Sequence, residues 1–177
     1  RLGECYIRAY LITIQNGICH FDDPGSGLRL TSRIEFLYGT FEARVQISPK
    51  GLQYIGFMSR QPWGYNSAFC MSLKNGNGWK LALSNDTSRK GVGVEINQGA
   101  DVGISVDLVE KAWCILKIVW QKEKIEFYAD GELKGIVTDK SLIPQRPVPI
   151  IIDQIFNCPI TIDYIKVTCP FSLYQLM

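Results

Sequence analysis

Hydrophobic and polar residues alternate with a period of two along much of the chain, and this period is typical of half-buried β-strands. The clearest example is Arg33–Ser48, in which hydrophobic side chains occupy every second position up to Tyr38. The alternation resumes after Gly39-Thr40, shifted by one residue. The shift predicts a β-bulge or a tight bend at Gly39-Thr40.

Further alternating or apolar segments, separated by turns rich in Gly, Pro and Asn, predict more short strands. They are Gln53–Ser59, Ser67–Leu73, Trp79–Ser84, Val92–Ile96, Val102–Val106, Trp113–Trp120, Ile125–Ala129, Glu132–Thr138, Ile150–Phe156 and Ile160–Thr168. Asp130-Gly131 is the strongest signal for a two-residue hairpin. No stretch of about ten residues has a helical period. The pattern therefore predicts an all-β fold, a two-sheet antiparallel sandwich or jelly roll.

Length and composition fit one globular domain over residues 1–177. The chain is 46% hydrophobic with a net charge of +2, which excludes intrinsic disorder and disfavours nucleic acid as a partner. No apolar run is long enough for a transmembrane helix. Because the chain starts at Arg1 without a signal peptide, it is either a processed mature protein or a domain excised from a longer one.

The six cysteines form no CxxC pair, and His20 is the only histidine, so the spacing of zinc ligands is missing. Buried free thiols are one interpretation. The other interpretation is that the protein resides in an oxidising compartment and that its six cysteines form up to three disulfides. In that case Cys5 with Cys19, and Cys158 with Cys169, could each close a short loop.

Three segments resemble the concanavalin A-like superfamily of lectins and glucanases, and most of all its laminarinase/lichenase-type glycoside hydrolases. Tyr38–Val45 (YGTFEARV) is similar to that branch's "YGxFEARxK" strand. Trp120 with Ile125–Gly131 (IEFYADG) is similar to its "W…IxFYVDG" hairpin, and Ile162–Val167 (IDYIKV) to its closing "VDYVRVY" strand. The resemblance spans roughly Thr31 to Thr168 and implies a concanavalin A-like jelly roll with core aromatics at Tyr38, Phe41, Trp120, Phe127 and Tyr164.

The catalytic acids of that branch are missing from the expected place. Its hydrolases carry an E-x-D-x-(x)-E strand, because one carboxylate attacks the anomeric carbon and another protonates the leaving oxygen. The matching segment here, Ser67–Leu73, contains no acid, and Glu95 is solitary in a nearby predicted strand. Glu35 and Glu42 are expected to be framework acids, Asp22-Asp23 to form a turn, and His20 alone is a poor basis for a triad.

Sugar binding needs aromatic planes for the C–H faces of the rings and polar groups for the hydroxyls. The region that matches the family's groove offers such residues, and Trp63, flanked by Pro62 and Gly64, is the sharpest candidate. The predicted contacts are Tyr54, Arg60, Trp63, Tyr65, Asn66 and Trp79, with Gln61, Asn75 and Asn77 nearby. Core packing is the alternative role for Trp63 and Trp79.

The resemblance also implies a structural calcium, bound by Asp163 and a carbonyl at Gly39. In the alternative, Asp163 belongs to a salt bridge. The leading functional hypothesis is a non-catalytic carbohydrate-binding or lectin-like domain, extracellular or at the cell surface, with a polysaccharide or glycan partner. The alternatives are a divergent glycoside hydrolase acting on β-glucans and a structural or adhesion module of a cell surface or virion. The oligomeric state is left open.

Overall fold

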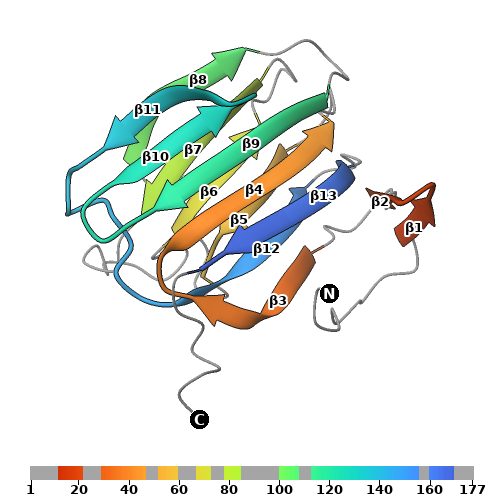
Figure 1. The fold of residues 1–177 in the computed structure, drawn as a ribbon, viewed down its shortest axis with the longest axis horizontal. Coiled ribbons are helices and arrows are strands. Elements are labelled where there is room, and N and C mark those ends of the chain that lie inside the picture. The colour runs from red at the N-terminus through yellow and green to blue at the C-terminus, as the bar shows by residue number, and fades with distance from the viewer. Residues whose placement is uncertain are drawn as a thin grey trace.

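The computed structural model describes residues 12–21, 29–46, 52–59, 67–72, 78–84, 100–107, 113–155 and 160–169, which form two antiparallel sheets (Figure 1). The strands are β1 (Ile12–Gln15), β2 (Ile18–Phe21), β3 (Arg29–Phe36), β4 (Gly39–Gln46), β5 (Leu52–Phe57), β6 (Ser67–Ser72), β7 (Gly78–Ser84), β8 (Ala100–Asp107), β9 (Trp113–Trp120), β10 (Ile125–Ala129), β11 (Glu132–Val137), β12 (Val148–Ile155) and β13 (Ile160–Thr168). The seven-stranded sheet has the order β1-β2-β13-β4-β9-β10-β11, and the six-stranded sheet has the order β3-β12-β5-β6-β7-β8. This arrangement confirms the predicted jelly-roll sandwich.

The hydrophobic core lies between the two sheets. Residues of β4, β9 and β10 alternate between buried and half-buried, as expected for strands that cover a core with one face. At its centre the ring of Phe57 lies edge-on to the rings of Phe41 and Trp120, with distances between ring centroids of 6.2 Å and 5.1 Å. The predicted core positions Phe41, Trp120 and Phe127 are confirmed, since each is at most 1% exposed.

Tyr164 does not enter the core, contrary to prediction. The register of β13 against β4 shifts between Ile162 and Tyr164, where Asp163 is the extra residue of a bulge. Ile162 belongs to the core, and Ile165 packs against it. Tyr164 stays half-buried, and its hydroxyl donates a hydrogen bond to Glu42 Oε1 at 3.1 Å. That bond agrees with the framework role expected for Glu42.

The shift of alternation at Gly39 marks a bend between the sheets. β3 ends at Phe36 in the six-stranded sheet, and β4 begins at Gly39 in the seven-stranded sheet. Tyr38 has φ +65° and Gly39 has φ +138°, so the bend uses left-handed backbone that favours glycine. Of the two alternatives left open by the sequence, the tight bend is therefore the one present.

Two hairpins have the tight turns that asparagine or aspartate followed by glycine favours. Asp130 and Gly131 have φ of 50° and 83° between β10 and β11, which confirms the predicted hairpin. Asn16 and Gly17 have φ of 52° and 79° between β1 and β2. The sequence prediction missed this second hairpin, although Asn-Gly is a strong signal for it. Val102–Val106 is confirmed within β8, and Val92–Ile96 lies outside the described residues.

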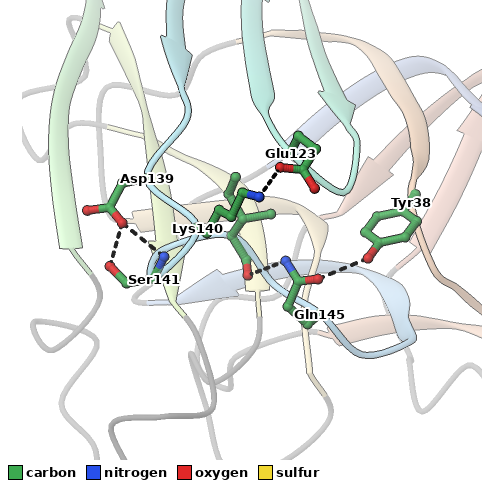
Figure 2. A network of polar contacts seen from close by, with 7 residues as sticks. Tyr38, Glu123, Asp139, Lys140, Ser141 and Gln145 are labelled. Carbon is green, nitrogen blue, oxygen red and sulfur yellow. Dashed lines mark hydrogen bonds and ion pairs between the residues drawn. The ribbon is translucent and has the colours of Figure 1, made fainter.

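The connection from β11 to β12 carries the chain from one sheet to the other and is held by several polar contacts (Figure 2). Gln145 accepts a hydrogen bond from the Tyr38 hydroxyl at 3.0 Å and donates one to the Ile143 carbonyl at 3.1 Å. The Trp120 indole donates to the Pro144 carbonyl at 3.1 Å, and Lys140 forms an ion pair with Glu123. These contacts thus fix the connection to Tyr38, to β9 and to the segment between β9 and β10 at this end of the sandwich.

Candidate functional site

Four of the six predicted sugar contacts lie outside the described residues. They are Arg60, Trp63, Tyr65 and Asn66, in the segment that connects β5 to β6 along the chain. Gln61, Asn75, Asn77, Glu95 and Asp22-Asp23 also lie outside them. The proposed roles of these residues therefore remain predictions from the sequence.

Trp79 is a core residue, so its predicted role as a groove surface is corrected. Its side chain is 0% exposed and belongs to the core cluster together with Leu81 and Leu83, the next residues on the same face of β7. The indole Nε1 is buried, with no hydrogen-bond partner among the described residues. Alternation along β7 places Trp79 towards the other sheet, where no polysaccharide can lie against its ring.

Tyr54 lies on the opposite face of the six-stranded sheet, here called the outer face. Ile55 and Phe57 of β5 belong to the core cluster, and side chains alternate along a strand, so Tyr54 points away from the seven-stranded sheet. Its ring packs edge-on against the ring of Phe69 on β6, with a distance of 5.8 Å between the ring centroids. Tyr54 is nevertheless only 1% exposed. It thus belongs to the predicted face of the sandwich without offering an open stacking surface.

A row of paired residues crosses the outer face through Tyr54. It runs from Asp153 on β12 through Tyr54 on β5 and Met71 on β6 to Lys80 on β7. Directly opposed residues of antiparallel strands share a face of the sheet. The row therefore places a carboxylate and a lysine on either side of Tyr54, with Lys80 half-buried and Asp153 buried.

The sequence prediction missed Asp153. It follows the apolar residues Ile150–Ile152 in a strand predicted to be buried, and a single acid in such a strand is a signal of a specific role. In the structure Asp153 is 2% exposed. A carboxylate is rarely buried to this extent without polar neighbours, so Asp153 is the most informative polar residue of the outer face.

Tyr54 keeps its proton at physiological pH. Burial, and next the negative charge of Asp153, raise the pKa of Tyr54 to about 12. Both causes favour the neutral phenol over the phenolate. The Tyr54 hydroxyl therefore remains a hydrogen-bond donor near a carboxylate, although both residues are at most 2% exposed and lie beneath the surface of the outer face.

Carboxylates at outer-face positions of the described strands are too far apart for glycoside hydrolysis. Asp101 and Asp107 of β8 pair with Ala82 and Gly78 of β7. Four strand spacings of about 4.8 Å separate β8 from Asp153 on β12, roughly 19 Å in all. Glu35 pairs with Pro149, four residues along β12 from Asp153, which places it about 14 Å away. Retaining enzymes need about 5–5.5 Å and inverting enzymes about 6.5–9.5 Å between the two carboxyl groups.

The strand that carries the acids in the resembling hydrolases has other residues here. In β6 the buried side chains Ser67 and Phe69 take outer-face positions, since Ala68 and Cys70 belong to the core. The Ser67 hydroxyl accepts a hydrogen bond from the Ser59 amide at 3.0 Å. Ser67 therefore fixes the end of the neighbouring strand β5, and neither residue supplies a titratable group.

The two residues predicted to bind calcium are not brought together. Gly39 lies at the start of β4, whereas the Asp163 bulge lies opposite Val45 and Arg44. A strand rises about 3.4 Å per residue, so the two positions are roughly 17 Å apart, whereas calcium bonds its ligands at about 2.3–2.6 Å. Asp163 instead accepts from Arg44 Nη1 at 2.5 Å. No cluster of three metal-binding acids, histidines or cysteines occurs in the described ranges.

Cys70, Cys114 and Cys169 are free thiols. The free Cys169 contradicts the suggested bond to Cys158, while Cys5 lies outside the described residues. Burial raises the pKa of Cys70 well above its usual value, and burial with the nearby Asp130 raises that of Cys114 to about 12. These two thiols stay protonated and pack as small hydrophobic side chains, as one of the two interpretations expected.

No protein-family model and no curated protein sequence matches the chain. Solved structures do match its fold. The carbohydrate-binding module CBM66 of Bacillus subtilis has a TM-score of 0.64 at 11% identity, over 89% of this chain and 90% of the module. The β-glucanase of Bacillus licheniformis has a TM-score of 0.65 at 18% identity, over 89% and 81%. The endo-β-1,3-glucanase of Pyrococcus furiosus has 0.65 at 19% identity, over 91% and 78%.

These matches define the class of fold. The chain is a concanavalin A-like β-sandwich of the kind found in a carbohydrate-binding module and in β-glucanases. At identities below 20%, the likeness extends to the fold and not to individual site residues. No helix of the described segments is long and apolar enough to cross a membrane.

Proposed function

We propose that this chain is a carbohydrate-binding domain that holds a polysaccharide on the outer face of its six-stranded sheet and does not cleave it. The observation that carries the proposal is the row Asp153–Tyr54–Met71–Lys80, which sets a carboxylate, a phenol and an ammonium on one face. Such groups form the hydrogen bonds that sugar hydroxyls require, and the half-buried Lys80 is the one of the three that a polysaccharide can reach, because Tyr54 and Asp153 are at most 2% exposed. A polysaccharide partner favours an extracellular or cell-surface location.

The spacing of the carboxylates supports binding without hydrolysis. Asp153 has no second carboxylate within about 10 Å at the outer-face positions of the described strands. A single carboxylate can accept hydrogen bonds from a sugar, but it cannot act as nucleophile and as general acid in the same step. The glucanases of similar fold supply the alternative, a divergent hydrolase acting on β-glucans.

The first test compares two lysines on opposite sheets. Lys80→Ala removes a half-buried ammonium from the outer face, and Lys117→Ala removes one from β9 of the seven-stranded sheet, where it lies 5.2 Å from the Tyr128 ring. Binding to a panel of soluble β-glucans and other polysaccharides is measured by calorimetry. We expect Lys80→Ala to weaken binding by about tenfold, as for one lost hydrogen bond to a charged group, and Lys117→Ala to leave it unchanged.

A reducing-end assay on the same polysaccharides separates binding from hydrolysis. We expect no release of reducing ends by the wild-type protein. Release that Asp153→Asn abolishes would establish the hydrolase instead. Absence of binding to every polysaccharide would favour the structural or adhesion module.

Trp63 provides a second, independent prediction. If its ring stacks on a sugar, Trp63→Ala should weaken binding by roughly tenfold, because stacking on an aromatic ring contributes about 1–3 kcal/mol in nucleic-acid complexes. The melting temperature should change little, because an exposed loop residue leaves no cavity in the core. A large fall in melting temperature with unchanged affinity would assign Trp63 to core packing.

A further inference from the structure

The edge strand β11 carries the two large hydrophobic side chains that are most exposed in the described part of the chain. Leu133 is 48% exposed and Ile136 is 49% exposed. β11 is the last strand of the seven-stranded sheet, so one of its edges has no neighbour within that sheet (Figure 1). β11 lies near β8, the last strand of the six-stranded sheet, but the two belong to different sheets. An edge strand without a neighbour in its own sheet offers backbone N–H and C=O groups to another strand.

A β-bulge places both hydrophobic side chains on the same face. Leu133 pairs with Tyr128 and Ile136 pairs with Glu126, and the register shifts between these pairs at Lys134. Residues three apart in a regular strand would point to opposite faces. The extra residue restores the phase, so Leu133 and Ile136 form one apolar strip along the sheet edge.

We propose that two copies of this chain associate by antiparallel pairing of their β11 strands, with Leu133 of each copy opposite Ile136 of the other. The two-fold axis then lies between Lys134 and Gly135. All four exposed hydrophobic side chains meet their counterparts across the new strand pair. Cross-strand pairs of this kind are the main stabilising contacts of antiparallel sheets.

Charges agree with this register. Lysine on an edge strand usually opposes pairing, but the Lys134 ammonium is bonded to Glu132 Oε2 of its own strand at 2.5 Å. In the proposed register Lys134 lies opposite Gly135 of the partner, which carries no charge. A shift by one residue would set Lys134 against Lys134, which like-charge repulsion disfavours.

The contact is only one strand wide, and so it falls in the class of small, reversible interfaces. We therefore expect a dimer in equilibrium with monomer, with a Kd below about 1 mM. Sedimentation velocity across a concentration series measures this equilibrium directly. The wild-type full chain is compared with the double variant Leu133→Lys plus Ile136→Lys.

Thr168→Lys is the matched control. Thr168 is exposed, pairs with Thr40 on β4, and lies in the same cross-strand row of the same sheet as Ile136, four strands away from β11. It introduces one lysine, against two in the double variant, on the same face but away from the edge. Circular dichroism melting of every variant establishes that each one folds.

We expect dimerisation of the wild type and of Thr168→Lys, and at least about a tenfold weaker dimer for the folded double variant. Any of three results would overturn the proposal. These are a wild type that is monomeric up to about 1 mM, a double variant that still dimerises like the wild type, and a control weakened as much as the double variant.

Discussion

Gly39 occupies the bend at which the chain passes from one sheet to the other, and Gly39→Ala tests the geometry of that bend. A Cβ atom built on Gly39 would lie 2.6 Å from the Thr168 carbonyl oxygen, which is backbone of the adjacent strand β13. Ordinary contacts of a Cβ begin at 3.4 Å. The alanine therefore cannot be accommodated by rotating a side chain, and β13 must move.

The expected cost has two parts. A residue other than glycine at φ +138° is strained by about 1–3 kcal/mol. Pushing a backbone strand out of a packed position adds about 1–3 kcal/mol. Gly39→Ala should thus lower the free energy of unfolding by about 4 kcal/mol, and the melting temperature by roughly 10 °C for a domain of this size.

Gly131→Ala is the control for the backbone part alone. Gly131 has φ +83°, and a Cβ atom built on it meets nothing within 4 Å. Gly131→Ala should therefore lower the free energy of unfolding only by the strain of alanine in a left-handed conformation, about 1–2 kcal/mol. The melting temperature should fall by roughly 4 °C. Urea unfolding of both variants, read by tryptophan fluorescence, gives the two free energies. Equal losses within about 0.5 kcal/mol would refute the argument from the close approach of Thr168.

Three further predictions follow from described contacts. Trp120→Phe deletes the donor to the buried Pro144 carbonyl, so the free energy of unfolding should fall by about 1–3 kcal/mol in urea titrations, and an unchanged value would contradict the hydrogen bond. The folded-state pKa of Tyr54, about 12, exceeds its ordinary value of 10.0, so its contribution to stability is present below pH 10 and is lost as pH rises towards 12. Ultraviolet titration should therefore show a tyrosine that ionises near pH 12, and Tyr54→Phe should remove that step. The half-exposed pair Arg44–Asp163 should contribute at most about 1 kcal/mol, and Asp163→Asn should lose less stability at high salt than at low salt.

Most of the fold could be predicted because it depends on local pattern. The period-two alternation of Phe41 to Val45 is the burial pattern of β4 itself, and Asp130-Gly131 sets its hairpin through backbone angles that glycine tolerates. The alternation at Gly39 could not distinguish a bulge from a change of sheet. Both shift the phase by one residue, and only the pairing partners separate them.

The candidate site was harder to predict because it depends on register. Trp79 and Tyr54 are both aromatic residues in predicted strands, yet one faces the core and the other faces outwards. Asp153 joins Tyr54 only through the pairing of β12 with β5, strands far apart in the sequence. The failure of Asp163 and Gly39 to meet has the same origin, since a one-residue bulge and a strand's length separate them.

The outer face shows how one sandwich can serve either binding or cleavage. The sheet geometry depends on the inward residues Ala68 and Cys70 of β6, which are fully buried between the sheets. The outward residues Ser67 and Phe69 take no part in that inward packing, and instead contact Ser59 and Tyr54. Two acids at neighbouring positions of this kind would allow glycoside hydrolysis, whereas Asp153 has no second carboxylate near it at the outer-face positions of the described strands. Function in this fold therefore depends on the alternate, outward residues of a few central strands, and their spacing in this chain is the basis on which we propose binding without cleavage.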